Sequence, residues 1–279
     1  HYDLGATLSS GQAFRWRRRG PAWEGVIGTR WVSLEAACDS ITAQTAEPVS
    51  EWDWLIDYLQ SGLNLQGILR TFPQDEPMQK AIAACHGLRL LRQLPWECLV
   101  SFLLSSTKQI IQIQQVVSLL CQRFGEPVAT PSLADRVYAF PSPARLARST
   151  EAELRTCKMG FRAPYVLAAA RAVESGRLDL ERLGQMSVEG ARSQLMELPG
   201  VGRKIADCVL LFAYGFQSAF PVDVWVMRAL QQFYFPRRRV SLERLHRFSA
   251  EHFGPNAGYA QQYLFHYART KLGVSRKLT

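Results

Sequence analysis

Long apolar runs are missing from this 279-residue sequence: the longest spans only residues 208–216, far below the roughly 18 residues of a membrane span. No CxxC pair occurs among the six cysteines, and no histidine stands at a ligand spacing from a cysteine. A structural zinc site and a cysteine-held iron–sulfur cluster are therefore not expected. Thiols spread this widely do not indicate a disulfide scaffold. We expect a reduced, intracellular, soluble protein with no membrane association.

Excess positive charge is missing from the first third of the chain. Residues 1–92 carry 9 basic and 10 acidic groups, whereas residues 93–279 carry 24 basic and 14 acidic groups, so the net charges are −1 and +10. Together they give the +9 of the whole chain. The surplus favours an anionic polymer as the partner of the second part. The alternative is an arginine-rich composition alone, since 27 of the 33 basic residues are arginine.

Hydrophobic patterning divides the chain into a strand-rich and a helix-rich part. Short β-prone runs predict an antiparallel meander at residues 14–16, 23–27, 31–34 and 41–45. From residue 94 onward the apolar spacing is helical, with predicted helices at 110–124, 187–198, 203–214 and 257–272. Other expected helix starts are residues 142–143, residues 149–151 and a cap at Asn256. We predict an α+β protein with a small antiparallel-sheet domain with short helices at 1–92 and a larger all-helical domain at 93–279.

A sharp turn separates two predicted helices where the sequence reads LPGVGRKIADC, residues 198–208. Glycines at positions 200 and 202 allow positive φ and the close approach of another backbone. The amides that open the second helix are unpaired and lie at the positive end of its dipole, where a phosphate can bind. A plain tight turn between packed helices is the alternative.

A carboxylate in apolar company follows the turn: Asp223, within FPVDV at residues 220–224. Taken alone, it is best interpreted as a helix N-cap. However, only six lysines occur in the chain, and Lys204 is the one on the turn.

With these residues in place, the chain resembles the helix-hairpin-helix (HhH-GPD) DNA glycosylases, and most closely the bacterial branch of the 8-oxoguanine DNA glycosylases/AP lyases. Other segments are similar to family motifs in the same order: SSGQAFRW at 9–16, GLRLLRQ at 87–93, MGFRA at 159–163 and GYAQ at 258–261. The resemblance covers residues 4–269. It implies a helix-hairpin-helix motif and an enzyme of base excision repair that removes 8-oxoguanine from double-stranded DNA and then cleaves the strand.

The resemblance also implies the roles of individual residues. Lys204 would attack C1′ of the damaged nucleotide and form a Schiff base, and Asp223 would stabilise the cationic sugar and assist proton transfer. The flipped base would be held by Gly11, Cys208, Gln261, Phe265 and Pro221. Spacing agrees independently, because Lys204 and Cys208 are four residues apart on one helix face, as are Gln261 and Phe265. The Gly11 carbonyl would accept the N7–H that 8-oxoguanine has and guanine lacks.

Further implied contacts lie on the duplex. Phe161 would wedge into the DNA beside the lesion, and Arg162 would contact the opposite base. The other expected DNA-binding residues are Gly200, Val201, Gly202, Thr107, Lys108 and Gln112. The backbone carbonyls of Met196, Leu198 and Val201 match positions that hold a structural cation (K⁺, Na⁺ or Ca²⁺). No other cofactor or metal is expected.

Three positions depart from the family. Thr107 stands where well-known eukaryotic members have an asparagine that fills the space of the vacated base. Gln112 stands where they have an arginine that reads the opposite cytosine, so we expect a relaxed preference for the base opposite the lesion. Trp225 replaces a histidine that often touches the phosphate.

We expect a monomer located with the DNA, in the cytoplasm or nucleoid.

Two other functions stay open from the sequence. One is a glycosylase of the same superfamily for another damaged base. Gly11 and Gln261 argue against it, because enzymes for alkylated bases tend to use an open aromatic cleft and lack the lysine. The other is a non-catalytic DNA-binding module that uses the hairpin only for phosphate. Lys204 together with Asp223 argues against that function, because a pure binder needs neither.

Overall fold

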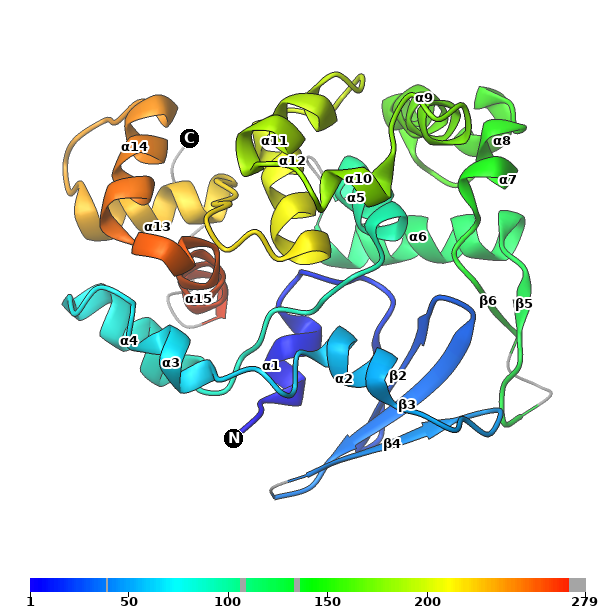
Figure 1. Ribbon diagram of the computed structural model, residues 1–279, viewed down its shortest axis with the longest axis horizontal. Helices are drawn as coiled ribbons and strands as arrows, with labels where there is room; N and C mark the ends of the chain where they lie inside the picture. The colour runs from blue at the N-terminus through cyan, green and yellow to red at the C-terminus, as the bar shows by residue number, and fades with distance from the viewer. Residues whose placement is uncertain (39, 106–108, 133–135, 271–279) are drawn as a thin grey trace.

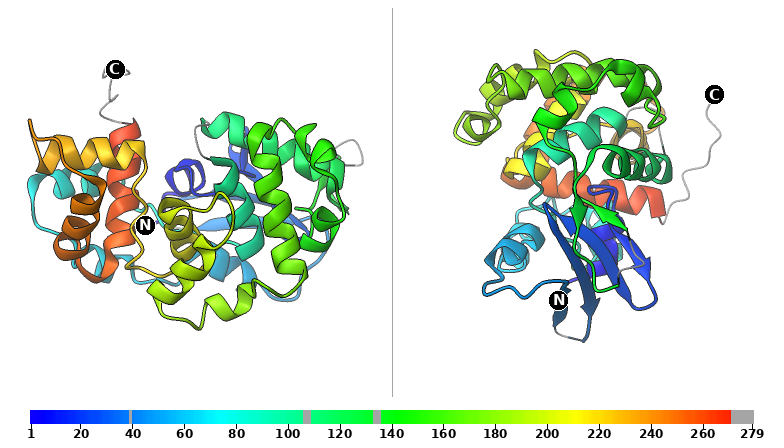
Figure 2. Two further views of the ribbon diagram at one scale, coloured as in Figure 1. Left: turned by 90° about the horizontal axis from the view of Figure 1, so that it is seen from above. Right: turned by 90° about the vertical axis from the view of Figure 1, so that its right-hand side faces the viewer.

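The computed structural model describes residues 1–38, 40–105, 109–132 and 136–270 of the chain. A four-stranded antiparallel sheet lies on one side of the molecule, and helices make up most of the rest (Figure 1). The predicted α+β class is therefore confirmed. The right-hand view of Figure 2 shows the sheet below a broad helical layer.

The sheet is a meander in which each strand pairs with the next along the chain. Its strands are β1 (Arg17–Arg19), β2 (Ala22–Ile27), β3 (Arg30–Ala36) and β4 (Ile41–Thr45). Val32 and Leu34, two residues apart on β3, are fully buried and share one core with apolar residues of the first two helices. This period of two is what a sheet with one covered face requires.

The first strand begins later than the sequence pattern predicts. Residues 14–16 are not a strand, and β1 starts at Arg17. Phe14 belongs to the larger of two hydrophobic cores and Trp16 to the smaller one. The segment therefore crosses from one core to the other, and this crossing explains its apolar residues.

Helices occupy both the N-terminal part and most of the rest of the chain. In the N-terminal part they are α1 (Leu4–Ser9), α2 (Asp53–Leu59), α3 (Leu65–Leu69) and α4 (Glu76–Ala84). Those that follow are α5 (Pro95–Ser105), α6 (Ile110–Phe124), α7 (Pro143–Ala147), α8 (Glu151–Arg155), α9 (Ala163–Glu174), α10 (Leu180–Leu183), α11 (Val188–Met196), α12 (Arg203–Val209) with its π-helical continuation η2 (Leu210–Tyr214), α13 (Val224–Tyr234), α14 (Leu242–His252) and α15 (Ala257–Thr270). A short hairpin of β5 (Pro127–Val128) and β6 (Val137–Tyr138) interrupts this series.

Several helix starts follow the predicted signals. The side chains of Ser142 and Thr150 accept hydrogen bonds from backbone amides in the first turns of α7 and α8. The predicted cap at Asn256 is wrong. A 3₁₀ turn, η3 (Gly254–Asn256), precedes α15, and the Asn256 amide instead donates to Thr71 Oγ1 at 3.0 Å.

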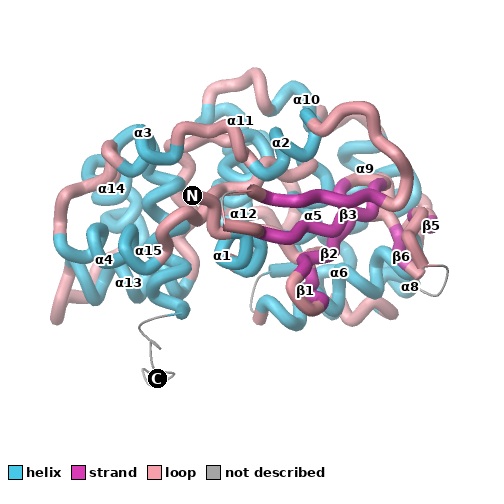
Figure 3. Tube along the Cα trace, turned by 90° about the horizontal axis from the view of Figure 1, so that it is seen from below, coloured by secondary structure: helices cyan, strands magenta, loops and turns pink. Residues whose placement is uncertain are grey.

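Two hydrophobic cores hold the chain together. The smaller core joins α1, one face of the sheet and α2. The larger core contains the helices of the second part together with α3 and α4, and α4 packs on α15 at the far end of the chain (Figures 1 and 3). The domain boundary predicted between residues 92 and 93 stays a prediction. In the described part of the chain, no helix is long and apolar enough to cross a membrane.

Candidate active site

A pocket of about 510 Å³ lies between the segment after α1 and the helices α5, α6, α12, α13 and α15. The predicted catalytic and base-holding residues all line it: Gly11, Lys204, Cys208, Pro221, Asp223, Gln261 and Phe265. The volume falls within the roughly 300–1,000 Å³ of small-molecule sites. The fold thus brings residues that are far apart in the sequence to one cavity.

Lys204 lies in the first turn of α12, directly after the glycine-containing turn. Its Nζ donates a hydrogen bond to Ser105 Oγ at 2.9 Å. The Ser105 hydroxyl itself donates to the Phe102 carbonyl at 2.8 Å, so its lone pairs are left for the lysine. The Lys204 Nζ also lies 5.5 Å from the centroid of the Phe102 ring. These contacts keep the amine at the pocket wall.

Asp223 is the N-cap of α13. Its Oδ1 accepts a hydrogen bond from the Val226 amide at 2.8 Å. Burial raises the pKa of the Asp223 carboxyl above its usual value, in opposition to the Val226 amide and the Lys204 charge, which lower it. The capping and catalytic interpretations are compatible, because the cap fixes a half-buried carboxylate in the pocket that also contains Lys204.

Cys208 and Gln261 supply the buried polar atoms of the base-holding set. Cys208 follows Lys204 by about one helical turn, and burial raises the pKa of its thiol to about 12, so the thiol is neutral at pH 7. Gln261 is only 4% exposed, and its Oε1 has no hydrogen-bond partner among the residues that the structure describes. An unpaired buried oxygen costs free energy. A donor on a bound ligand would satisfy it.

Gly11 stands where the pocket wall leaves no room for a side chain. A Cβ at this position would lie 2.8 Å from Ile110 Cδ1 and 3.5 Å from Phe265 Cε1. The φ of Gly11 is +81°, a conformation that glycine adopts without steric cost. Glycine therefore lets the main chain itself form this wall of the pocket.

The predicted DNA-contacting hairpin and wedge are neighbours on the molecule. A Cβ on Gly200 would lie 2.5 Å from the ring of Tyr165, so the hairpin packs directly against that ring. Tyr165 in turn makes an edge contact with Phe161 at 6.5 Å between centroids. Phe161 is 59% exposed, and an exposed aromatic ring beside a helix-opening turn suits contact with a DNA duplex.

The residues predicted to contact the opposite strand differ in their surroundings. Arg162 is only 3% exposed, and its guanidinium carbon lies 4.3 Å from the centroid of the Phe161 ring. Gln112 is exposed, and its side-chain oxygen accepts a hydrogen bond from the Gln109 amide at 2.9 Å as part of the capping box of α6. Thr107 and Lys108 lie outside the described residues.

The donor set predicted for a hairpin cation is chemically suitable. Met196 is the last residue of α11, and the carbonyls at a helix C-terminus are unpaired and carry partial negative charge. The Leu198 carbonyl accepts a hydrogen bond from the Val201 amide at 3.1 Å, which occupies one of its two lone pairs. Backbone oxygens are ligands for hard cations. In the described ranges, no group of three or more His, Cys, Asp or Glu side chains could hold a metal.

Trp225, at the position of the family's phosphate-contacting histidine, also lines the pocket. Four further lining residues were not predicted from the sequence to belong to the site: Phe102, Ser105, Arg228 and Arg269. Arg269 carried a usable signal, because it extends the spacing of four residues from Gln261 and Phe265 along α15. Its guanidinium carbon lies 5.6 Å from the centroid of the Phe265 ring. The contact between Ser105 and Lys204 joins residues 99 positions apart and has no local signal.

Comparison with known proteins assigns this fold and site to a class. Residues 100–253 match the HhH-GPD superfamily of base excision DNA repair proteins, and residues 1–99 match the N-terminal domain of 8-oxoguanine DNA glycosylase. The fold, the hairpin and the pocket containing lysine and aspartate thus define a DNA repair glycosylase of the helix-hairpin-helix class.

Individual relatives narrow the assignment. The N-glycosylase/DNA lyase OGG1 of Arabidopsis thaliana is 32% identical over 94% of this chain and 76% of its own length. The structure of MBOgg1 with a low affinity DNA ligand is 34% identical, with a TM-score of 0.91 over 96% of this chain and 92% of that one. The 8-oxoguanine glycosylase/lyase of Clostridium acetobutylicum, solved with double-stranded DNA containing cytosine opposite 8-oxoguanine, is 30% identical, with the same score and coverage. The chain belongs to the 8-oxoguanine DNA glycosylase family.

Proposed function

We propose that this chain removes 8-oxoguanine from double-stranded DNA and then cleaves the strand, with Lys204 as the nucleophile and Asp223 as its catalytic partner. The observation that carries the proposal is the pocket. It unites a lysine amine, a half-buried carboxylate and an unpaired amide oxygen on Gln261 in one cavity of suitable size for a base.

The chemistry requires the damaged nucleotide to leave the duplex, since its sugar is not accessible within the stack. The neutral amine of Lys204 attacks C1′, and the bond from C1′ to N9 breaks with its electron pair leaving on the base. The new secondary ammonium gives one proton to the departed base. The bond from C1′ to O4′ then opens with its electron pair going to O4′, which takes up the second proton, and the product is the Schiff base. Loss of a 2′ proton expels the 3′ phosphate by β-elimination. Asp223 stabilises the positive charge that develops on the sugar.

Recognition of the base rests on Gly11, Gln261, Cys208, Phe265 and Pro221. The Gly11 carbonyl accepts the N7–H of 8-oxoguanine, whereas guanine would present a lone pair to the same oxygen. Leaving such a buried group unpaired costs about 1–3 kcal/mol, or roughly 5- to 150-fold in rate. Gln261 hydrogen-bonds the Watson–Crick edge, and Cys208 and Phe265 lie on the two faces of the base.

DNA binding is assigned to the face that carries the hairpin and Phe161. The amides of Gly200 and Gly202 bind a phosphate, Val201 lies between them on the same DNA-contacting turn, and Phe161 opens the stack beside the lesion. A hard cation on the carbonyls of Met196, Leu198 and Val201 would add positive charge there without taking part in catalysis. We further propose that the enzyme acts as a monomer and is located with the chromosome, in the cytoplasm or nucleoid.

The contacts on the opposite strand are proposed separately. Arg162 contacts the opposite base, which requires it to leave its buried position against Phe161. Thr107, Lys108 and Gln112 also contact the DNA. Gln112 lacks the charge and the paired N–H donors by which an arginine recognises one particular base. We therefore propose a relaxed preference for the base opposite the lesion.

The test is strand cleavage on three duplexes that contain 8-oxoguanine, guanine or an abasic site. We expect the parent protein to cut the first and third, and Lys204→Gln to cut neither while still binding DNA. Lys80→Gln is the matched control, because Lys80 is an exposed lysine paired with Glu76 and should not matter. A Lys204→Gln protein that still cleaves the 8-oxoguanine duplex at the parent rate would overturn the proposal.

A further inference from the structure

The segment that carries Gly11 is irregular, yet side chains from distant parts of the chain hold its backbone. Three successive hydrogen bonds reach its carbonyls. Arg269 Nη2 donates to the Ser9 carbonyl at 2.7 Å, Gln262 Nε2 to the Ser10 carbonyl at 3.1 Å, and Gln93 Nε2 to the Gln12 carbonyl at 2.6 Å. Side-chain donors that satisfy main-chain oxygens fix the path of a loop.

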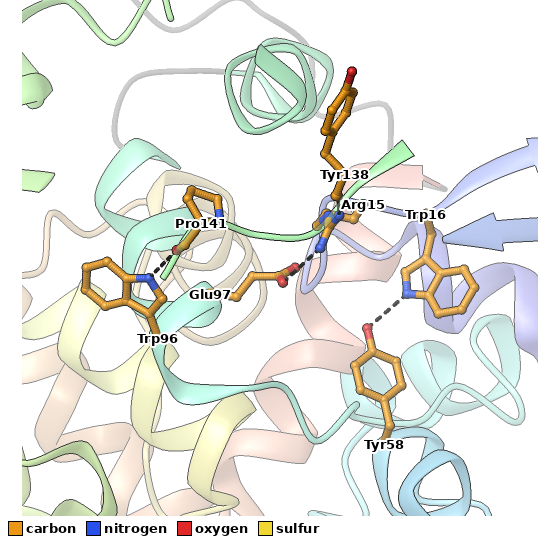
Figure 4. Close-up of polar contacts among 7 residues, drawn as sticks. All are labelled: Arg15, Trp16, Tyr58, Trp96, Glu97, Tyr138 and Pro141. Atoms are coloured by element: carbon orange, nitrogen blue, oxygen red, sulfur yellow. Dashed lines mark hydrogen bonds and ion pairs between the residues drawn. The ribbon is translucent and has the colours of Figure 1, made fainter. Parts of the chain in front are cut away.

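The far end of the segment is anchored by Arg15. Its Nη1 lies 3.3 Å from Glu97 Oε2 on α5, and its Nη2 donates to the Tyr138 carbonyl on β6. Figure 4 shows the guanidinium between these two partners. The Gln12 side chain adds bonds to the carbonyls of Thr7 and Arg89. The segment is therefore fixed on both sides of Gly11.

Gly11 itself is the exception. Within the residues that the structure describes, its carbonyl accepts no hydrogen bond, whereas those of Ser9, Ser10 and Gln12 all do. The residue nevertheless lines the pocket, and a Cβ built on it would lie 3.5 Å from Phe265 Cε1. A free carbonyl between fixed neighbours is what a preorganised acceptor requires.

Helix α15 contributes both to the lining of the pocket and to the hydrogen bonds that hold the Gly11 segment. Gln261, Gln262, Phe265 and Arg269 all line the pocket. Gln262 and Arg269, which are seven residues apart on one face of the helix, also hold the Gly11 segment. One rigid element therefore sets the separation between the Gln261 amide and the Gly11 backbone. Gln262 is 2% exposed, so its side chain has little freedom to make a different contact.

We propose that Gln262, supported by Arg269, is a positioning residue for lesion discrimination: it places the Gly11 carbonyl at a fixed distance from Gln261, so that both edges of one base are read together. This inference rests on the proposed function, because it assigns the Gly11 carbonyl to the N7–H of 8-oxoguanine. A displacement of about 1 Å is enough to lose an oriented contact of this kind.

The experiment compares two substrates that differ only at that edge. One duplex contains 8-oxoguanine and the other 8-oxo-7-deazaguanine, which keeps the C8 carbonyl and the Watson–Crick edge but has a CH2 group in place of N7–H. The variant is Gln262→Met, which keeps the volume and removes the donor. Single-turnover excision is measured on both, and lyase activity on an abasic duplex reports the chemistry that needs no base.

We expect Gln262→Met to lower excision of 8-oxoguanine by about tenfold or more, in line with loss of one buried hydrogen bond. Excision of the deaza analogue should change by less than about twofold, so that the ratio of the two rates falls. Tyr263→Phe is the matched control. It removes a buried hydrogen bond from the next residue of α15 to the Leu88 carbonyl, away from Gly11, and should leave the ratio unchanged.

A second variant keeps the test valid if Gln262→Met folds poorly. Arg269→Met removes the bond to the Ser9 carbonyl from a less buried position, and Arg269→Lys should restore part of the ratio by returning a donor. The positioning role would be overturned if Gln262→Met and Arg269→Met lowered the excision rates of 8-oxoguanine and of the deaza analogue equally, or if the ratio of these two rates did not change. A parent protein that does not excise 8-oxoguanine would instead refute the proposed function.

Discussion

Replacing Gly11 with alanine tests the interpretation that the main chain itself forms the base-reading wall. The φ of +81° places an alanine in the left-handed region, which costs about 1–2 kcal/mol. The new Cβ would also lie 2.8 Å from Ile110 Cδ1, so that flexible methyl group must move by a few tenths of an ångström. The methyl group of alanine enters the pocket, and the carbonyl turns away from its position. Loss of that hydrogen bond costs about 1–3 kcal/mol, so we expect excision to fall by roughly 5- to 150-fold.

The matched control is Gly20→Ala. Gly20 has a φ of +59° in the turn before β2, and a Cβ there meets nothing within 4 Å. Gly20→Ala should lower the thermal stability through the same backbone strain as Gly11→Ala, and it should leave the rate of excision unchanged. The assay is single-turnover excision of 8-oxoguanine, with lyase activity on an abasic duplex measured beside it. Excision by Gly11→Ala within about twofold of the parent, at equal stability to Gly20→Ala, would refute the reasoning.

Four further predictions concern Asp223, position 112 and a buried ion pair outside the pocket. Asp223→Asn keeps a capping oxygen for the Val226 amide, so we expect little change in unfolding free energy but a loss of about 10²–10⁴ in excision rate. Because burial raises the pKa of Asp223, the parent rate should fall with decreasing pH sooner than an ordinary aspartate would dictate, as the needed carboxylate takes up a proton, and a pH profile checks this. Without an arginine at position 112, excision opposite cytosine should exceed excision opposite adenine by less than about a hundredfold, and Gln112→Arg should widen the ratio. Arg192→Met removes the partner 2.6 Å from Asp207, which is 1% exposed, and should cost about 3–5 kcal/mol in denaturant unfolding, whereas Arg155→Met at an exposed pair should cost less than about 1 kcal/mol.

Local signals in the sequence were sufficient for much of the helical part. The helix predicted at 110–124 has those bounds in the structure, and its apolar period of 3.6 matches the buried positions of α6. Short spacing also placed Lys204 beside Cys208 and Gln261 beside Phe265, because residues four apart on a helix share a face. All four line one pocket.

The features of the fold and the site that could not be predicted from the sequence depend on long-range contacts. The segment 14–16 has a β-prone composition, but Phe14 packs in the larger core and Trp16 in the smaller one. No local sequence pattern indicates that the segment crosses between two cores. The bonds from Gln262 to Ser10 and from Arg15 to Glu97 span 252 and 82 positions. Such contacts depend on how α15 and α5 pack against the N-terminal segment. Only the folded chain brings them together.

The most direct test of the central claim is borohydride trapping on a duplex with one 8-oxoguanine opposite cytosine, followed by identification of the modified peptide. The account predicts a covalent complex whose attachment lies on Lys204, and no complex with Lys204→Gln. Trapping at another of the six lysines, or a trapped complex that persists in Lys204→Gln, would contradict it.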